Sequence, residues 1–369
     1  NGNDFADEAL NNGAKIAILQ GKRKLNKKKI KVKSTLELLN KLSQKIRTSS
    51  NASQIAITGS SGKTSLKELL GQCLKKNYST VFSKNSFNNK FGLPLSLINL
   101  NKDTIYGVFE IGMDRKGEID YLSKIIKPDI GVITNITYAH AENFRSLFDI
   151  AKAKSEIIFN IRKNGTIILN NDDKFFNFFS KLASKNNLNI ISFGKHKDSN
   201  IRLSKIKKSK KTCTMYINAE NKIYNFKINN DLMPYVYNIL ASLAVCKSIG
   251  IIEKIKSDFF SNYKILGGRG NIKKITVGSK KVNVIDESYN SNPLSLKFSI
   301  KKFDNLKINP NKKFMLLGDM KELGKFSKKL HIDAAKDLNR MKFKKLFVYG
   351  SNIIETFNKI RTQKRGRIL

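Results

Sequence analysis

The sequence has little cysteine, few acidic residues and no long apolar run. Its cysteines, Cys73, Cys213 and Cys246, form no CxxC pair, so we expect neither a disulfide framework nor a zinc site, and the pattern fits a reducing cytosol. No apolar run approaches the ~18 residues of a membrane-spanning helix, so we expect no membrane span. No charged and then apolar leader opens the chain, so a secretory signal is not supported.

What is present is enough apolar material for real hydrophobic cores. The chain has 369 residues, of which 40% are hydrophobic, with 23 Phe and 11 Tyr. At ~150 residues per domain, this length predicts two to three domains. The composition excludes a chain that is disordered throughout.

The charge is strongly one-sided, because 70 Lys and Arg face 29 Asp and Glu, a formal net charge of +41. Such an excess raises the possibility of nucleic acid or an anionic membrane surface as a partner. A nucleic-acid site usually shows a local basic stripe with Arg and interleaved aromatic residues. Here Lys dominates, Arg is sparse, and Lys, Asn and Ile are abundant everywhere, so we favour compositional bias and expect no obligatory nucleic-acid partner. The positive field would still attract anionic ligands such as nucleotides.

The first part of the chain is typical of a small α/β unit. We predict a short helix at 4–12, a strand at 15–19 and a basic loop at 21–33. A helix at 34–46 begins with Ser34 as its N-cap. The small polar residues at 48–53 predict a linker.

From residue 54 the pattern changes to alternating strands and helices, which predicts a parallel sheet with crossover helices. Strands are predicted at 55–57, 105–109, 130–134, 166–169 and 190–193, and helices at 63–76, 118–126, 147–161 and 236–249. A further α/β pattern follows residue 267, with strands at 282–285, 313–317 and 346–349 and helices at 295–303 and 327–339. The tail at 362–369 shows no periodicity.

The strongest chemical signal is TGSSGKTS at 58–65, which follows a short apolar strand and opens a helix. A phosphate-binding loop requires this context, because its glycines let backbone N–H groups turn toward phosphate oxygens at a helix N-terminus. Lys63 would neutralise the β- and γ-phosphates, and Thr64 would offer its hydroxyl to Mg²⁺. A strict Walker A loop has Gly where this chain has Ile57. The alternative is an ordinary Gly/Ser-rich turn before a helix.

Two further residues are expected at the same edge of the sheet. Glu110 ends the predicted strand 105–109, and ligands of open α/β sheets gather at the carboxyl ends of strands, where a carboxylate can hold Mg²⁺. His140 follows the strand 130–134, and a neutral imidazole could be a second metal ligand, although a lone His is as often structural. Lys154 lies on a predicted helix, and an ammonium group cannot bind Mg²⁺.

Two polar segments follow strands in the last part of the chain. DESYNSNP at 286–293 places Asp and Asn where they could orient hydroxyl and amine groups of ligands, although it is also an ordinary turn signal. GDMKELG at 318–324 follows another strand, with His331 downstream.

Taken in order, these segments resemble the Mur ligases, the ATP-dependent amide ligases of peptidoglycan synthesis. They span nearly the whole chain in the family's order: TGSSGKTS (58–65), NSFNNKFGLP (85–94), EIG (110–112) with GEI (117–119), Asn135 with His140, AKAKSEI (151–157), NNDD (170–173), NILASLAV (238–245), GRG (268–270), DESYNSNP (286–293) and LGDMKELG (317–324) with His331. The phosphate loop is shared by all Mur ligases and by folylpolyglutamate synthases. YNSNP and GDMKELG point to the members that join D-alanyl-D-alanine to UDP-N-acetylmuramoyl-tripeptide, and the Asp-Asn-Pro-Arg signature of the preceding ligase is absent.

The resemblance implies an α/β fold with three domains. These are a partial N-terminal domain for the UDP-substrate (1–48, the N-terminal region), a central P-loop ATPase domain with a parallel sheet (49–264, the central region) and an incomplete, Rossmann-like C-terminal ligase domain (265–369, the C-terminal region). It also implies ATP and Mg²⁺ as cofactors, an ADP-forming reaction and an acyl-phosphate intermediate. We expect a cytoplasmic monomer.

The resemblance further implies roles for individual residues. Those implied to bind ATP are Gly59, Ser60, Ser61, Gly62, Lys63, Thr64, Ser65, Asn238, Arg269 and Asp286. Those implied to hold Mg²⁺ are Thr64, Glu110, His140 and Lys154, the last after carbamylation, which would turn its amine into an anionic oxygen ligand. Those implied to face the UDP-substrate or the reacting ends are Asn88, Asn89, Tyr289, Asn290 and Asn292, and the implied catalytic residues are Lys63, His140, Lys154 and Asn290.

Some positions depart from the family's pattern. Asn1-Gly2-Asn3 stands where the family has Asp-Gly-His, Pro234 stands where a His usually precedes the adenine-side Asn, and the C-terminal Lys-Gly-Ser-Arg segment is missing. We therefore expect a chain that is truncated at both ends. Two alternatives remain open: another Mur ligase or a folylpolyglutamate synthase-like amide ligase, and a basic nucleotide- or nucleic-acid-binding protein without ligase activity.

Overall fold

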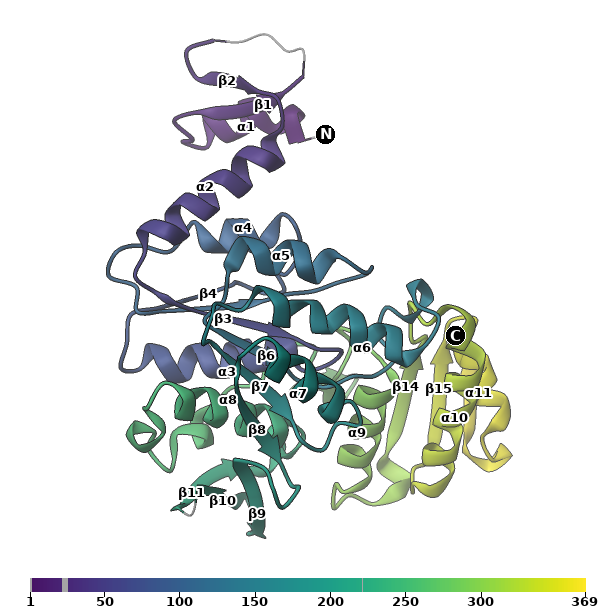
Figure 1. Ribbon diagram of the computed structural model, residues 1–369. Coiled ribbons are helices and arrows are strands. Elements are labelled where there is room, and N and C mark those ends of the chain that lie inside the picture. Colours follow the sequence, from purple (N-terminus) through teal and green to yellow (C-terminus); the bar gives the residue numbers. More distant parts are fainter. Residues whose placement is uncertain (1, 22–25, 221) are drawn as a thin grey trace.

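The structure is a computed structural model that describes residues 2–21, 26–220 and 222–369. In the N-terminal region, β1 (Ala17–Gln20) and β2 (Lys29–Val32) form a two-stranded parallel sheet beside α1 (Ala6–Asn11). The predicted basic loop 21–33 is therefore wrong in its second half, because β2 pairs there with β1; residues 22–25 lie outside the described part. Figure 1 shows α2 (Thr35–Ser49) running from this sheet to the central one.

The capping prediction for α2 is confirmed, since the hydroxyl of Ser34 accepts a hydrogen bond from the backbone N–H of Glu37. The helix continues through Ser49, into the stretch predicted to be a linker, and β3 begins at Ser53. The connection is therefore shorter than expected.

The central region is built on a nine-stranded sheet in the order β11-β10-β9-β8-β7-β6-β3-β5-β4. The strands from β4 to β9 pair in parallel, which confirms the predicted parallel sheet, whereas β9, β10 and β11 form an antiparallel meander that the sequence did not reveal. The strands are β3 (Ser53–Thr58), β4 (Thr80–Phe82), β5 (Tyr106–Glu110), β6 (Ile130–Ile133), β7 (Thr166–Asn170), β8 (Asn189–Gly194), β9 (Ile201–Lys208), β10 (Thr212–Ala219) and β11 (Lys222–Asn229).

Helices cover both faces of this sheet, so its middle strands are buried on both sides and are almost continuously apolar. In β3, Ile55 and Ile57 belong to the core under α3 and α8, whereas Ala56 belongs to the core under α4, α5 and α6. The helices are α3 (Lys63–Lys75), α4 (Gly92–Leu97), α5 (Glu118–Ile126), α6 (Leu147–Ser155), α7 (Phe176–Lys185) and α8 (Val236–Ser248). No helix in the described part of the chain is both long and apolar enough to cross a bilayer.

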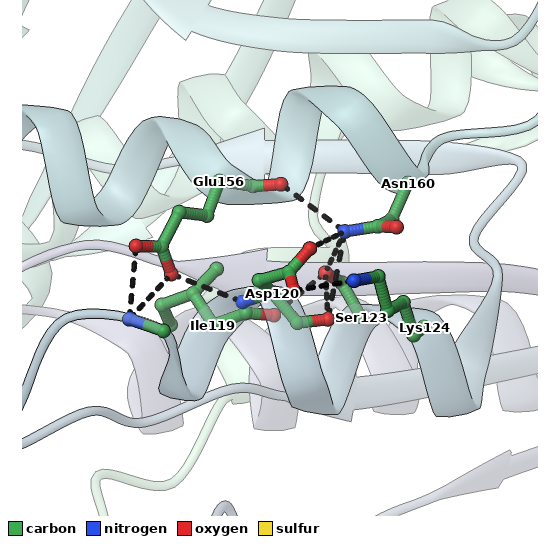
Figure 2. A network of polar contacts seen from close by, with 7 residues as sticks. Ile119, Asp120, Ser123, Lys124, Glu156 and Asn160 are labelled. Atoms are coloured by element: carbon green, nitrogen blue, oxygen red, sulfur yellow. Dashed lines mark hydrogen bonds and ion pairs between the residues drawn. The ribbon is translucent and has the colours of Figure 1, made fainter.

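The predicted helix 147–161 is an α-helix only as far as Ser155, because a 3-10 turn at Glu156–Asn160 replaces its last part. Figure 2 shows this turn against the start of α5. The carboxylate of Glu156 accepts hydrogen bonds from the N–H groups of Gly117 (2.9 Å) and Asp120 (3.1 Å), and Asn160 donates to Asp120. The side chain of Glu156 thus satisfies N–H groups that α5 itself cannot pair.

The C-terminal region holds a parallel three-stranded sheet in the order β14-β15-β16, with a separate antiparallel hairpin of β12 and β13. Its elements are β12 (Asn271–Val277), β13 (Lys280–Asp286), α9 (Pro293–Asp304), β14 (Phe314–Gly318), α10 (Ser327–Arg340), β15 (Lys345–Tyr349), α11 (Ile353–Lys359) and β16 (Arg365–Ile368). The strand predicted at 282–285 lies in the hairpin, and the aperiodic tail contains β16, which pairs with β15.

The order of the strands determines what can meet at the edge of the central sheet. Because β3 lies between β5 and β6, the segments that follow these three strands emerge next to one another. In Figure 1 the C-terminal region, coloured green to yellow, lies beside this part of the central region. The expected α/β fold is confirmed, while the domain limits at 48/49 and 264/265 stay predictions.

Candidate active site

The loop between β3 and α3 has the backbone that a phosphate site needs. Gly59 and Gly62 have positive φ angles of 139° and 83°. A Cβ atom at Gly59 would lie 1.9 Å from Oγ1 of Thr134, so only glycine fits there. The ammonium group of Lys63 donates to the carbonyl of Gly59 (2.9 Å), and burial lowers the pKa of Lys63. The loop thus brings the N–H groups at the start of α3 and the ammonium group of Lys63 to the same side of the cavity.

A carboxylate and a hydroxyl meet beside this loop. The side chain of Glu110, at the end of β5, is 1% exposed, and its two oxygens accept hydrogen bonds from the hydroxyl of Thr64 (2.7 Å) and the amide of Asn88 (2.7 Å). Strand β3, which leads into the loop, pairs in parallel with β5, and its Ile57 lies opposite Glu110. The sheet therefore brings together two of the residues predicted to hold Mg²⁺.

His140 and Lys154 lie close to the same point. Nδ1 of His140 is 2.7 Å from a carboxylate oxygen of Glu322 and 3.0 Å from one of Asp114. Burial lowers the pKa of His140, and nearby Lys63 and Lys154 lower it further, while Glu322 acts in the opposite direction. Lys154 is 1% exposed, and burial together with the charge of Lys63 lowers its pKa well below the usual range. Burial thus shifts the equilibrium of Lys154 toward the neutral amine.

The C-terminal region completes the site from the other side. The guanidinium of Arg269 donates to the hydroxyl of Thr64 (3.0 Å) and stacks on the ring of Tyr289, 4.1 Å from its centroid. The hydroxyl of Tyr289 hydrogen-bonds to Ser86 (2.6 Å), which lies 3.3 Å from Thr64. Between the two regions lies a cavity of about 740 Å³, large enough for a nucleotide.

The donor set fits a divalent cation that is shared with a phosphate. Within the described residues, no three side chains of His, Cys, Asp or Glu converge as a complete metal site. The hydroxyl of Thr64, the buried carboxylate of Glu110 and the imidazole of His140 offer hard or borderline ligands around the phosphate loop. Mg²⁺ is usually held by one or two carboxylates together with substrate phosphates, so these residues are sufficient for such a site.

Comparisons with known proteins agree with this geometry. The family description "Mur ligase middle domain" matches residues 57–246, and "Mur ligase, glutamate ligase domain" matches residues 270–366. The chain belongs to the Mur ligase family.

Among curated proteins, this Mur ligase is similar to the UDP-N-acetylmuramoyl-tripeptide--D-alanyl-D-alanine ligase of Buchnera aphidicola subsp. Baizongia pistaciae. The two are 36% identical over 365 residues, which covers 96% of this chain and 74% of the relative. The enzyme of the same name from Rickettsia prowazekii is 33% identical, over 89% of this chain and 73% of its own.

Solved structures show the same likeness. The crystal structure of MurF from Acinetobacter baumannii matches with a TM-score of 0.85 and 27% identity, over 99% of this chain and 78% of that one. MurF from Thermotoga maritima in complex with ADP matches with a TM-score of 0.83 and 28% identity, over 100% and 82% of the two chains. The resemblance inferred from the motifs is confirmed.

Most of the predicted site residues of this Mur ligase line the cavity. They are Ser60, Ser61, Gly62, Lys63, Thr64, Ser65, Asn88, Glu110, His140, Asn238, Arg269, Tyr289, Asn290 and Asn292. Asn238, at the start of α8, donates to the carbonyl of Gly62 (3.3 Å) and so joins α8 to the phosphate loop. The motifs thus located parts of the cavity wall in seven separate places along the chain: 60–65, 88, 110, 140, 238, 269 and 289–292.

Four predicted site residues are not part of the cavity wall: Gly59, Asn89, Lys154 and Asp286. The side chain of Asn89 accepts hydrogen bonds from the N–H groups of Phe91 and Gly92 in the turn that leads into α4. Asp286 pairs with Lys273 (2.7 Å) and accepts from Ser288, and these contacts lower its pKa to about 2.

Several residues of the site were not predicted from the sequence. Ser86 lies inside a motif that was recognised, yet only its contacts with Thr64 and Tyr289 reveal its position. Tyr237 also lines the cavity, and its hydroxyl donates to Asp172 (2.9 Å), which belongs to the NNDD segment. Nothing in the local pattern around Tyr237 distinguishes it from a core aromatic residue. Glu322 was noted only as part of GDMKELG.

Proposed function

We propose that this chain is an ATP-dependent, ADP-forming ligase that joins D-alanyl-D-alanine to UDP-N-acetylmuramoyl-tripeptide. The observation that carries the proposal is the cavity in which the phosphate loop, the Thr64–Glu110 pair and the Arg269–Tyr289 pair face one another. The Buchnera and Rickettsia relatives bear the name of that activity, and MurF from Thermotoga maritima was solved with ADP.

In the first step, a carboxylate oxygen at the end of the tripeptide attacks the γ-phosphorus of ATP. The bond from this phosphorus to the bridging oxygen breaks, so ADP leaves and an acyl phosphate forms. The protein's part in such a transfer is mainly positioning and charge neutralisation. The ammonium group of Lys63 and the N–H groups of the loop hold the phosphates, and Arg269 approaches from the C-terminal region, 3.0 Å from Thr64.

In the second step, the amine of D-alanyl-D-alanine attacks the carbonyl carbon of the acyl phosphate. The tetrahedral intermediate then collapses with loss of inorganic phosphate, and the amine proton is released. Water must be excluded, since it would hydrolyse the acyl phosphate. We assign this exclusion to the C-terminal region, whose Tyr289, Asn290 and Asn292 form one wall of the cavity. We also assign these three residues to the reacting ends of the substrates.

The metal ligands in this proposal are Thr64, Glu110, His140 and a carbamylated Lys154. Bound Mg²⁺ would supply positive charge to the phosphate oxygens. Carbamylation forms a bond between Nζ of Lys154 and the carbon of CO₂, and one proton is released. It requires the neutral amine, and the burial that lowers the pKa of Lys154 favours that form.

Other roles follow the family's pattern. We assign Asn88 and Asn89 to the UDP-substrate and Asn238 to the adenine side, and we assign Asp286 to the nucleotide in a conformation in which it leaves Lys273. A monomer in the cytoplasm stays the prediction. The buried free thiols of Cys73, Cys213 and Cys246 fit a reducing compartment.

The test is an assay of ADP release with UDP-N-acetylmuramoyl-tripeptide and D-alanyl-D-alanine added singly and together. Release should require both, and Lys63→Ala should abolish it, whereas Lys75→Ala, which removes an exposed lysine from the same helix, should not. Turnover with a different acceptor amine would favour a sister ligase. Salt-sensitive RNA binding without substrate-stimulated ATP hydrolysis would refute the ligase and favour the basic binding protein.

A further inference from the structure

The C-terminal region touches the central region at a second place, next to His140. The carboxylate of Glu322 lies 2.7 Å from Nδ1 of His140, and the backbone carbonyl of Glu322 accepts a hydrogen bond from the N–H of Glu142 (3.0 Å). The ring of Phe326 packs on that of Tyr138, with 4.9 Å between centroids. A short segment of the C-terminal region thus docks on both sides of His140.

This docking segment is also held firmly within its own region. The N–H of Met320 donates to Nε2 of His331 (3.1 Å), and His331 is fully buried. The carboxylate of Asp319 accepts a hydrogen bond from the N–H of Ile353 (2.7 Å), at the start of α11. Glu322 is therefore attached to the body of the C-terminal region and must move with it.

The contact also determines which nitrogen of His140 is available. A carboxylate can only accept a hydrogen bond, so Nδ1 carries the proton and Nε2 keeps its lone pair. Two carboxylates share this one donor: Asp114 from the central region (3.0 Å) and Glu322 from the C-terminal region (2.7 Å). Histidine ligands of metals commonly donate their other ring N–H to a carboxylate, which orients the ring and strengthens it as a ligand.

We propose that Glu322 is a positioning residue that couples docking of the C-terminal region to metal binding, because it orients His140 only when that region is docked. This inference rests on the proposed function, in which His140 is a metal ligand. Coupling is reciprocal, so a metal and nucleotide bound in the central region must also favour docking of the C-terminal region. Asp114 stays beside His140 in either state, whereas the contact of Glu322 exists only in the docked one.

The test measures Mn²⁺ binding to the whole chain by equilibrium dialysis in the presence of a non-hydrolysable ATP analogue. Replacing an outer carboxylate of this kind typically costs 10–100-fold in metal affinity, so we expect Glu322→Gln to weaken Mn²⁺ binding by about 10-fold. The matched control is Glu355→Gln, which removes another partly exposed carboxylate of the C-terminal region, paired only loosely with Lys328 (3.7 Å), and it should bind as the unmodified chain does. Glu322 is 47% exposed, so its substitution does not threaten folding.

A double-mutant cycle separates orientation of His140 from docking alone. If Glu322 acts through His140, Glu322→Gln should have no further effect on Mn²⁺ affinity in a His140→Asn background. An equal loss in both backgrounds, or no loss in either, would overturn the inference while leaving the proposed function intact. If the unmodified chain binds no Mn²⁺ with the ATP analogue, the metal site of the proposed function fails, and the inference fails with it.

Discussion

Lys67 is fully buried in the first half of α3, and its replacement by methionine should destabilise the central region strongly. Its ammonium group donates to the carbonyl oxygens of Ser83 and Asn85 (2.7 Å to the latter) and pairs with the carboxylate of Glu68 (2.8 Å). Lys67→Met keeps the shape of the side chain but leaves these acceptors without their donor.

The magnitude follows from the kind of contact that is lost. Removing one partner of a buried charge pair costs about 3–5 kcal/mol, because the other groups stay buried and unpaired. One kcal/mol corresponds to about 2–4 °C for a region of this size, so we expect the midpoint of thermal unfolding to fall by roughly 6–20 °C. Lys67→Arg should keep part of the stability, since a guanidinium can still donate to the carbonyls.

The measurement is thermal unfolding followed by circular dichroism, with Lys75→Met, an exposed lysine on the same helix, as the control. The same substitution should raise the KM for the UDP-substrate more than that for ATP. The reason is that Lys67 holds the start of the loop that carries Ser86 and Asn88, whereas Lys63 stays in place. A midpoint for Lys67→Met within about 2 °C of the control would refute this account of the buried cation, since each kcal/mol should shift it by at least that amount.

Two other predictions concern charged groups with shifted pKa values. Lys154→Met should abolish ligase activity yet make the chain more stable at pH 7 in CO₂-free buffer, because the cost of burying an amine that is charged in the unfolded chain disappears. Because folding lowers the pKa of Lys154, the unfolded state binds more protons than the folded state. The stability gained by Lys154→Met should therefore shrink as pH rises toward the ordinary pKa of lysine. A variant that is less stable than the unmodified chain in urea unfolding would contradict this. The contacts of Asp286 with Lys273 and Ser288 lower its pKa to about 2. Its contribution to the free energy of unfolding is therefore present above the ordinary pKa of aspartate and disappears as pH falls toward 2. In Asp286→Asn the free energy of unfolding should therefore fall less between about pH 4 and pH 2 than in the unmodified chain. The measurement is urea unfolding at each pH, and an equal fall in both proteins would show that Asp286 does not contribute.

The helices and strands of the central region could largely be predicted from the sequence, because each depends mainly on residues that are close to it in the chain. The apolar run at 55–57, the glycines at 59 and 62 and the helix that begins at Lys63 all follow from short-range sterics and burial. The alternation of strands and helices predicted the parallel sheet for the same reason. Short strands with mixed polarity, such as β2 and β16, were missed, because only their partner strands make them strands.

The sequence by itself determined that this chain has a phosphate loop, a carboxylate at the end of a neighbouring strand and the ordered motifs of a Mur ligase. Only the tertiary structure decided which side chains from distant parts of the chain meet. Examples are Arg269 with Thr64, Tyr289 with Ser86 and Glu322 with His140. The physical reason is that a motif specifies local backbone and residue type, whereas a contact between two regions depends on how their surfaces pack, which no short-range pattern encodes.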